Sequence, residues 1–541
     1  MPVDALALPL LVVTALGVLG YALVLRRNAG APGVRSGWLL VALIVAATLL
    51  AAATIGERAG FVAFALYNLG VVVPFWLRQR LQRAYGAGDE QRALRLARLL
   101  RIVHPTQAVR DEVASLPTLL ALRAGDDVPP AELDRIAGDH PHVRRLFDVV
   151  VLHNRRDVDA VRAAFDDPEE RAELFAQGLG AIYVQAIGCT DPSGDRLAEA
   201  IAAALAGDPL LRQPERGARL VIQCHALAGD VAATRALGEA LAMYLERGDK
   251  LVLLGLAQWC AGDRAAALAT LAAGQTAVCD HRVARATLAS LAAMIERRPP
   301  RPATAPSPAL QHRLAALRRE VPVLRALAPF LGRHARRPRL THAWMAVLLV
   351  SFAAVEATGD SLDPEHLYAC GALAVDLFTP AEAWRLATLT LLHAGGLHLT
   401  LNVLMLWRFG GFVEALYGRA RLAAIYALSA ALSGLAVVSF GGHHLLVGAS
   451  GAIMALGGAV LAALLVRRDL RATPIGRTEL IVLVLLFVLQ VVFDVTTPEV
   501  SATAHAAGIL SGLLLGALLT PRTDAALANM PSETCPEKPA P

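Results

Sequence analysis

Residues 447–460 read VGASGAIMALGGAV and residues 503–516 read TAHAAGILSGLLLG, and both runs are apolar and rich in small residues. Each run has a polar side chain near its start, Ser450 in the first and His505 in the second. Small residues then repeat at four-residue spacing, as Gly451 and Ala455 in the first run and Gly508, Gly512 and Gly516 in the second. Such spacing places the small residues on one face of a helix, so we expect two membrane helices that pack with their backbones close together.

Ser450 and His505 are also expected at the same depth in a bilayer. Each lies 17 residues before an arginine that ends its apolar run, Arg467 for Ser450 and Arg522 for His505. At ~1.5 Å of rise per residue, both lie about 25 Å above those arginines. A hydrocarbon core is about 30 Å thick, so both side chains are predicted just below its outer edge. A serine hydroxyl needs a base to become a good nucleophile, and the pair therefore indicates acyl transfer.

The composition agrees with a membrane protein. Of the 541 residues, 55% are hydrophobic and only 18% are charged, and the mean hydropathy is +0.49. Soluble globular proteins are usually about 45–50% apolar. The apolar residues concentrate in 1–77 and 340–520, whereas the segment between them is charged and has helical periodicity. The sequence predicts an all-α polytopic membrane protein in which two membrane blocks flank a soluble domain.

The expected organisation follows these changes in composition. Its parts are three membrane helices in 1–79, a soluble helical domain in 80–297, a proline-rich linker and basic amphipathic helix in 298–339, a six-helix core in 340–520 and a disordered tail in 521–541. The turns at Gly229-Asp230 and Gly262-Asp263 are 33 residues apart, close to the roughly 34-residue tetratricopeptide period. Helical-hairpin repeats and an irregular bundle both remain open. The amphipathic helix suits either an anionic membrane surface or a solvated connection.

Arginines mark one side of the membrane. They flank the apolar runs at Arg26, Arg27, Arg78, Arg80, Arg337, Arg339, Arg467 and Arg468. By the positive-inside rule these ends are cytoplasmic. We therefore expect an integral, multi-pass protein of a bacterial inner or plasma membrane, with its N-terminus outside and its helical domain and C-terminus in the cytoplasm.

The sequence indicates no cofactor and no metal. Its 6 cysteines have no CxxC or Cys/His spacing, and His443 and His444 have no further ligands nearby. The net charge of +5 reflects the arginines beside the apolar runs, and no nucleic-acid motif is present. The expected partners are transmembrane protein substrates, the lipid bilayer and protein partners of the helical domain.

Residues 384–407 add a further polar element. They read WRLATLTLLHAGGLHLTLNVLMLW, whose polar front does not fit a simple membrane span. His398 and Asn402 are four residues apart and share a helix face, from which both side chains can donate to a developing oxyanion. Arg408 lies about 9 Å below Asn402, where an unpaired charge is unfavourable. No partner for Arg408 is evident from the sequence.

Together these residues closely resemble the rhomboid intramembrane proteases. The resemblance covers about 340–520 and rests on Trp384-Arg385, His393, His398, Asn402, Gly410-Gly411, Glu414, Gly448-x-Ser450-Gly451, and Ala504-His505 with Gly508 and Gly512. It implies a serine endopeptidase with a Ser450/His505 dyad, no acidic third member, and no metal or cofactor. It also implies an oxyanion site at His398 and Asn402 with room left by Gly448, a supporting His393, and a membrane-embedded loop around Trp384 and Arg385.

A different class of function remains open. A non-proteolytic membrane chaperone or binding protein, as among inactive rhomboid relatives, would use the helical domain as its working part. The presence of both Ser450 and His505 favours the protease. In a third hypothesis the protein is a protease whose helical domain recruits partners and so decides what is cut.

Overall fold

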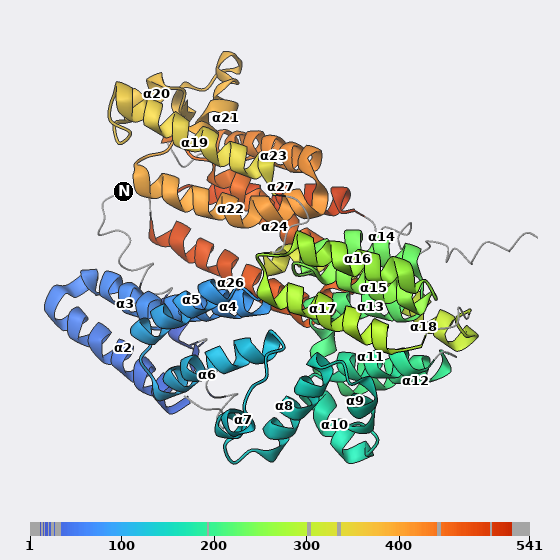
Figure 1. The fold of residues 1–541 in the computed structure, drawn as a ribbon. Helices are drawn as coiled ribbons and strands as arrows, with labels where there is room; N and C mark the ends of the chain where they lie inside the picture. The colour runs from blue at the N-terminus through green and yellow to red at the C-terminus, as the bar shows by residue number, and fades with distance from the viewer. Residues whose placement is uncertain are drawn as a thin grey trace, which may run out of the picture. The chain divides into compact units, whose positions relative to one another are not determined.

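The computed structural model describes residues 34–191, 194–299, 305–332, 337–440, 445–497 and 500–521, together with isolated residues before 34. Almost all of this chain is helical (Figure 1), and the expected all-α polytopic fold is confirmed. The chain divides into two compact units. We name them after their main segments, the membrane unit for Ala326–Thr523 and the helical unit for Leu66–Arg325.

Candidate membrane spans occur where the apolar runs predicted them. Among the described residues, 7 helices are long and apolar enough to cross a bilayer. They are Gly37–Ile55, Ala59–Gly86, Arg339–Thr358, Gly396–Tyr417, Arg419–Phe440, Pro474–Thr496 and Ala502–Leu519. The shorter apolar helix Ser450–Val466 completes the runs expected in the C-terminal block. The run expected at 5–25 lies largely outside the described residues.

The membrane unit is built around one buried helix. Its elements are α19 (Arg339–Thr358), α20 (Pro364–Ala369), β1 (Leu373–Ala374), α21 (Arg385–Thr388), α22 (Gly396–Tyr417), α23 (Arg419–Phe440), β2 (Leu445–Leu446), α24 (Ser450–Val466), α25 (Arg468–Ala472), α26 (Pro474–Thr496) and α27 (Ala502–Leu519). Most of α24 is buried, and it packs against α22, α23 and α27 (Figure 1). The short strands β1 and β2 pair antiparallel, with Leu373 opposite Leu446.

The helices α24 and α27 approach each other closely because glycines line their interface. A Cβ built on Gly508 would lie 2.2 Å from the carbonyl oxygen of Gly451. One built on Gly512 would lie 2.0 Å from the carbonyl oxygen of Ala455, and one on Gly458 would lie 2.5 Å from that of Ile509. Real side chains do not tolerate such contacts, so this packing requires glycine. The small-residue faces predicted from the sequence therefore do meet.

Buried polar side chains join the other ends of these helices. The Tyr417 hydroxyl donates to one carbonyl each of α24 and α27, at 2.9 and 3.2 Å. The carboxylate of Glu414 accepts the backbone N–H of Thr341 at 2.8 Å and that of Leu340 at 3.1 Å, and so caps the start of α19. Each group satisfies hydrogen bonds that a membrane interior cannot supply.

Arg408 has a partner that the sequence did not reveal. Its Nη2 lies 2.6 Å from Oε2 of Glu479, near the start of α26. The pairing compensates the charge of Arg408 and links α22 to α26. The cost expected for an isolated arginine therefore does not arise.

The helical unit continues the all-α pattern. Along the chain, α2 (Val34–Ile55) and α3 (Ala59–Tyr67) precede α4 (Val73–Gly86), α5 (Glu90–Val103), α6 (Gln107–Arg123), α7 (Pro130–Ala137), α8 (Pro141–Asn154), α9 (Val158–Ala163), α10 (Pro168–Ala176), α11 (Gly180–Thr190), α12 (Asp195–Gly207), α13 (Pro214–Leu227), α14 (Val231–Ala240), α15 (Asp249–Cys260), α16 (Arg264–Ala277), α17 (Arg282–Arg297) and α18 (Pro308–Leu327).

Turns of the sequence Ala-Gly-Asp connect many of these helices. They occur at residues 87–89, 124–126, 137–139, 228–230 and 261–263, and the glycine of each has a positive φ between 55° and 90°. Glycine adopts this left-handed conformation without a steric penalty and so ends the helix. At Asp89, Asp230 and Asp263 the carboxylate then accepts an N–H of the next helix, at 3.0, 2.9 and 2.9 Å.

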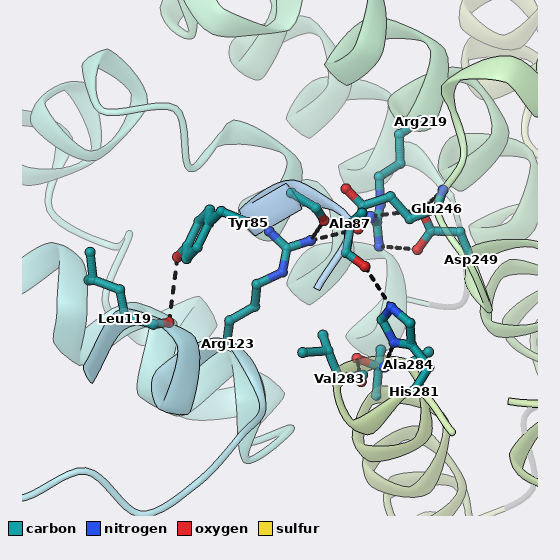
Figure 2. A network of polar contacts seen from close by, with 12 residues as sticks. Tyr85, Ala87, Leu119, Arg123, Arg219, Glu246, Asp249, His281, Val283 and Ala284 are labelled. Atoms are coloured by element: carbon teal, nitrogen blue, oxygen red, sulfur yellow. Dashed lines mark hydrogen bonds and ion pairs between the residues drawn. The ribbon is translucent and has the colours of Figure 1, made fainter. Parts of the chain in front are cut away.

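Helices far apart along the chain meet in the helical unit, because the start of α17 contacts the turn between α4 and α5. His281, just before α17, lies with Nε2 2.6 Å from the carbonyl oxygen of Ala87 (Figure 2). Next to it, Arg282 pairs with Glu90 at 3.1 Å. The helices therefore close on themselves into a ring, although the repeats expected from the sequence would also permit an open solenoid. Tetratricopeptide-like repeats remain a prediction.

The basic amphipathic helix packs against protein. In α18 the apolar side chains of Leu310, Leu314, Leu317, Val321 and Leu324 are buried. The helix is anchored by Arg318, whose Nη2 lies 2.8 Å from Asp230 Oδ2, and by the Tyr244 hydroxyl, which donates to the Leu324 carbonyl at 2.6 Å. Its apolar face is therefore occupied by protein, and the choice between a membrane-surface helix and a solvated connection stays a prediction.

We predict that Gly512→Ala destabilises the membrane unit by about 1–3 kcal/mol, the usual cost of overpacking. The new Cβ would lie 2.0 Å from a backbone oxygen of α24, which cannot move without moving that helix. Gly396→Ala is a matched control, because the nearest atom to its Cβ is 4.0 Å away. The measurement is the thermal unfolding midpoint in detergent. Equal midpoints for the two variants would contradict the prediction.

Candidate active site

Ser450 is the first residue of α24 and follows a turn that only glycine adopts easily. In that turn Gly448 has a φ of 119°, and its N–H donates to the Leu389 carbonyl at 2.9 Å. A Cβ built on Gly448 would lie 2.9 Å from Nε2 of His398 and 3.8 Å from the Ser450 hydroxyl oxygen. Because Gly448 has no side chain, the space between the His398 ring and the Ser450 hydroxyl stays open. The first N–H groups of a helix have no partner within it, so α24 offers donors beside the same space.

His505 lies in the first turn of α27, next to the start of α24. The Ser501 hydroxyl caps this turn by accepting the N–H of Ala504 at 3.2 Å. A Cβ built on Gly451 would lie 3.4 Å from the Ala504 carbonyl oxygen. The residues that adjoin Ser450 and His505 are thus in contact, and the two helix ends predicted to meet do so.

One side of the His505 ring faces a carboxylate on α26. Asp494 Oδ1 lies 2.8 Å from Nδ1 of His505, and the two side chains are only 6% and 7% exposed. Gln490, one turn earlier in α26, has its Nε2 2.8 Å from the same Oδ1 and 3.1 Å from Nδ1 of His505. The acidic neighbour that the resemblance excluded is present in this chain.

A carboxylate oxygen only accepts, so Asp494 at 2.8 Å favours the His505 tautomer with its proton on Nδ1. The amide nitrogen of Gln490 can only donate, so it donates to Oδ1 of Asp494. The Nδ1–H of His505 then donates to the same oxygen of Asp494. Because both donors share this oxygen, Nε2 of Gln490 and Nδ1 of His505 lie only 3.1 Å apart. An imidazole with its proton on Nδ1 carries a lone pair on Nε2. Within the described part of the chain, no hydrogen bond occupies that Nε2.

His398 and Asn402 share a face of α22, as their spacing predicts. Nδ2 of Asn402 donates to the His398 carbonyl at 3.0 Å, which leaves its second N–H unused. His393 packs edge to face against His398, with ring centroids 5.2 Å apart. Among the described residues neither ring nitrogen of His393 has a hydrogen-bond partner. His398 therefore adjoins Ser450 across Gly448, whereas His393 contacts His398 and not the hydroxyl.

Trp384 and Arg385 belong to the loop between α19 and α22. The Arg385 guanidinium is buried and donates to the carbonyls of Tyr368 and Ala372, at 2.7 and 3.0 Å. It also pairs with Glu382 and stacks on the rings of Tyr368 and Trp384, at 4.0 and 4.4 Å. One arginine thus holds together the loop that ends beside Gly448. Trp384 is 49% exposed.

Sequence reasoning missed the residues that hold His505. Gln490 and Asp494 are four residues apart in LLFVLQVVFDVT (485–496), an otherwise apolar run. Polar side chains at that spacing share one helix face, and in a membrane helix they normally have a partner. This signal was available, although it does not identify the partner. His443 and His444 lie outside the described residues.

Comparison with known proteins places this site in a recognised family. The rhomboid domain model matches residues 380–522. The chain is 33% identical to "Rhomboid protease GluP" of Bacillus subtilis (strain 168) over 183 residues, which are 34% of this chain and 35% of GluP. It is 32% identical to "RHOMBOID-like protein 5" of Arabidopsis thaliana over 161 residues, 29% of this chain and 51% of that protein. The matches therefore span between about a third and a half of these relatives' length.

A shorter relative is covered more fully. The chain is 33% identical to "Putative rhomboid protease YdcA" of Bacillus subtilis (strain 168) over 138 residues, which are 25% of this chain and 67% of YdcA. The matched region contains the elements that carry Ser450, His505 and His398. It leaves the helical unit unmatched by the family model.

Proposed function

The chain belongs to the rhomboid family, and from that premise we propose that it hydrolyses peptide bonds of transmembrane proteins near the outer face of the membrane. In this proposal Ser450 is the nucleophile and His505 is the general base. The observation that carries it is the His505 ring, held by Asp494 at 2.8 Å on one nitrogen and free on the other, at the helix end beside Ser450.

Acyl transfer proceeds in two halves. The Ser450 hydroxyl oxygen attacks the substrate carbonyl carbon while its proton passes to Nε2 of His505. The tetrahedral intermediate then collapses, the C–N bond breaks, and the leaving amine takes that proton. A water molecule repeats the sequence on the acyl-enzyme, releasing the new carboxylate and restoring the serine hydroxyl. Each half needs the same base and the same donors to the oxyanion.

The donors to the oxyanion surround Gly448. They are the His398 ring, the unused N–H of Asn402 and the first backbone N–H groups of α24. The left-handed turn at Gly448, with no side chain in the way, keeps this space open. His393 supports the His398 ring by packing, and Arg385 holds the loop that closes this end of the site.

Asp494 acts as a positioning residue through His505. Its carboxylate fixes the tautomer with the proton on Nδ1 and stabilises the imidazolium that forms when Nε2 takes the serine proton. Gln490 donates to the same carboxylate oxygen and so fixes the orientation of Asp494. No metal or cofactor takes part in these steps, and none is needed for them to balance.

The orientation follows from the arginines. We place the helical unit and the C-terminus in the cytoplasm, and the loop that contains Trp384 and Arg385 on the outer side, in a bacterial inner or plasma membrane. Substrates then enter from the bilayer, and water enters from the outer side. Protein partners of the helical unit would act on the cytoplasmic side.

We predict that Ser450→Ala and His505→Ala each abolish cleavage without unfolding the protein. The nucleophile and the base act as one unit, so the double variant should be no worse than either single variant. Cleavage is measured by comparing membrane proteins released from cells that express the wild type or a variant. A fluorophosphonate probe in detergent gives a second measurement that needs no known substrate, because only an activated serine displaces its fluoride. Released fragments that persist in cells with Ser450→Ala would leave the chaperone hypothesis standing.

We predict that Asp494→Asn lowers the rate of fluorophosphonate labelling and kcat by about 10²–10⁴, as expected when the acidic partner of a catalytic histidine is removed. KM should change little, because Asp494 contacts no substrate in this mechanism. Gln490→Met should have a smaller effect, about tenfold, because it removes only one hydrogen bond to Asp494. The matched control is Thr496→Val, since the Thr496 hydroxyl bonds only to carbonyls of its own helix. If the probe labels the Asp494→Asn variant at the wild-type rate, Asp494 does not position His505.

We predict opposite accessibility for two natural cysteines. Cys279 is exposed in the helical unit, and Cys370 is partly exposed in the loop before Arg385. In variants that keep one cysteine, an impermeant maleimide added to intact spheroplasts should label Cys370 and not Cys279, and both should react after lysis. The reverse pattern would invert the proposed orientation.

A further inference from the structure

The ring of helices in the helical unit encloses a cavity of about 540 Å³. Contacts between segments far apart along the chain close it. Arg123 at the end of α6 reaches Glu246 at 2.6 Å, and His281 before α17 reaches Ala87 after α4 at 2.6 Å (Figure 2). The walls include apolar side chains of α11 and α15, such as Ile182, Val252 and Leu256, beside polar ones. A volume of this size and a lining of this kind are typical of sites for small organic ligands or chain ends.

The charged groups of the wall do not cancel. Arg123 pairs with Glu246, and Arg219 makes two contacts of 3.1 Å with Asp249. Arg156 also lines the cavity, but among the described residues no carboxylate lies within ion-pair distance of it. Its Nε donates to the Ser290 hydroxyl at 3.2 Å, a neutral partner. Arg216 lines the cavity as well and donates to the Gly178 carbonyl at 3.1 Å, but it is exposed, whereas Arg156 is half-buried. Positive charge is therefore in excess beside the cavity.

Arg156 also has an unfavourable backbone conformation. The Ala-Gly-Asp turns of this unit place glycine in the left-handed region, whereas the equivalent turn after α8 reads Arg155-Arg156-Asp157. Arg156 has a φ of 56° and is the single residue other than glycine with a positive φ among the described residues. Strain of this kind persists where the side chain has a use, and such residues cluster at ligand sites. Here the strained residue is also the more buried of the two lining arginines that have no ion pair among the described residues.

Burial and neighbouring positive charge shift the pKa values of two groups in this wall. Burial, with the charges of Arg156 and Arg219, lowers the pKa of His153 to about 3. Burial also lowers the pKa of Arg156 itself to about 10, and Arg219 contributes to that shift. Both shifts mean that added positive charge is disfavoured in this wall. A bound anion would reverse that effect.

We propose that this cavity binds a ligand with one carboxylate and an apolar body, and that Arg156 binds the carboxylate. The apolar side chains of the wall match the body of an organic acid rather than inorganic phosphate. Gln185 and Thr287 line the same cavity and supply further polar contacts, while Ile182, Val252 and Leu256 contact the apolar part. The carboxylate belongs either to a small organic acid or to the C-terminus of a peptide. This site is separate from the proposed protease chemistry and does not depend on it.

The test uses the full chain in detergent and titration calorimetry. The probes are N-acetyl-leucine and N-acetyl-leucyl-leucine, each as the free acid and as the primary amide, together with inorganic phosphate. We expect the wild type to bind a free acid at least about tenfold more tightly than the matching amide. This is the difference that one charge-assisted hydrogen bond typically makes. Tighter binding of the dipeptide acid assigns the site to a peptide end, and tighter binding of N-acetyl-leucine assigns it to a small acid.

The decisive variants are Arg156→Gly and Arg156→Lys. Glycine removes the charge and relieves the strain, so Arg156→Gly should lose the preference for the acid while its unfolding midpoint stays equal or rises. Lysine keeps the charge, so Arg156→Lys should retain part of that preference. A fall in the midpoint of Arg156→Gly would mean that Arg156 serves only to bond Ser290 across the ring, and would overturn the proposal. Equal binding of acid and amide by the wild type, no binding of either acid, or tighter binding of phosphate would overturn it as well.

Discussion

The membrane unit depends on the approach of two helix backbones. A Cβ on Gly508 would lie 2.2 Å from the Gly451 carbonyl oxygen, and one on Gly512 would lie 2.0 Å from that of Ala455. No other residue type permits this distance. It sets the position of the first turn of α27 against the first residue of α24, and therefore the position of His505 against Ser450. The other helices support this pair, as the Tyr417 hydroxyl does by bonding to both.

Several charged side chains of the membrane unit have partners on another helix, and these partners explain part of the architecture. Water and lipid cannot supply such interactions inside a bilayer, so each of these side chains links two elements of the chain. Arg408 joins α22 to α26 through Glu479, and Asp494 joins α26 to α27 through His505. The same two links hold α26, whose surface is otherwise largely exposed apolar side chains. In this chain the helix that positions the histidine is therefore itself held by one ion pair and one hydrogen bond.

The helical unit is organised by its turns rather than by close packing of helix backbones. Repeated Ala-Gly-Asp turns end one helix in a left-handed glycine and begin the next at an aspartate, which lets helical hairpins follow one another. Contacts between residues far apart in sequence, such as Arg282 with Glu90, then close the array into a ring. Closure creates the cavity, and the one turn that departs from glycine places Arg156 in its wall.

The sequence alone determined which segments span the membrane, because span length and apolarity are local properties. It also determined which faces of the two helices are lined by glycine, since helical periodicity follows from residue numbers, and it predicted one depth for Ser450 and His505. The family pattern supplied His398, Asn402, Gly448 and the loop of Trp384 and Arg385. What remained undecided were pairings between elements. Whether Asp494 faces His505, whether Glu479 meets Arg408, and whether α17 returns to α5 depend on how each helix is rotated about its axis and where it is packed. Only the tertiary structure fixes the rotation and the position of each helix, because several side chains on one helix could face the same neighbour.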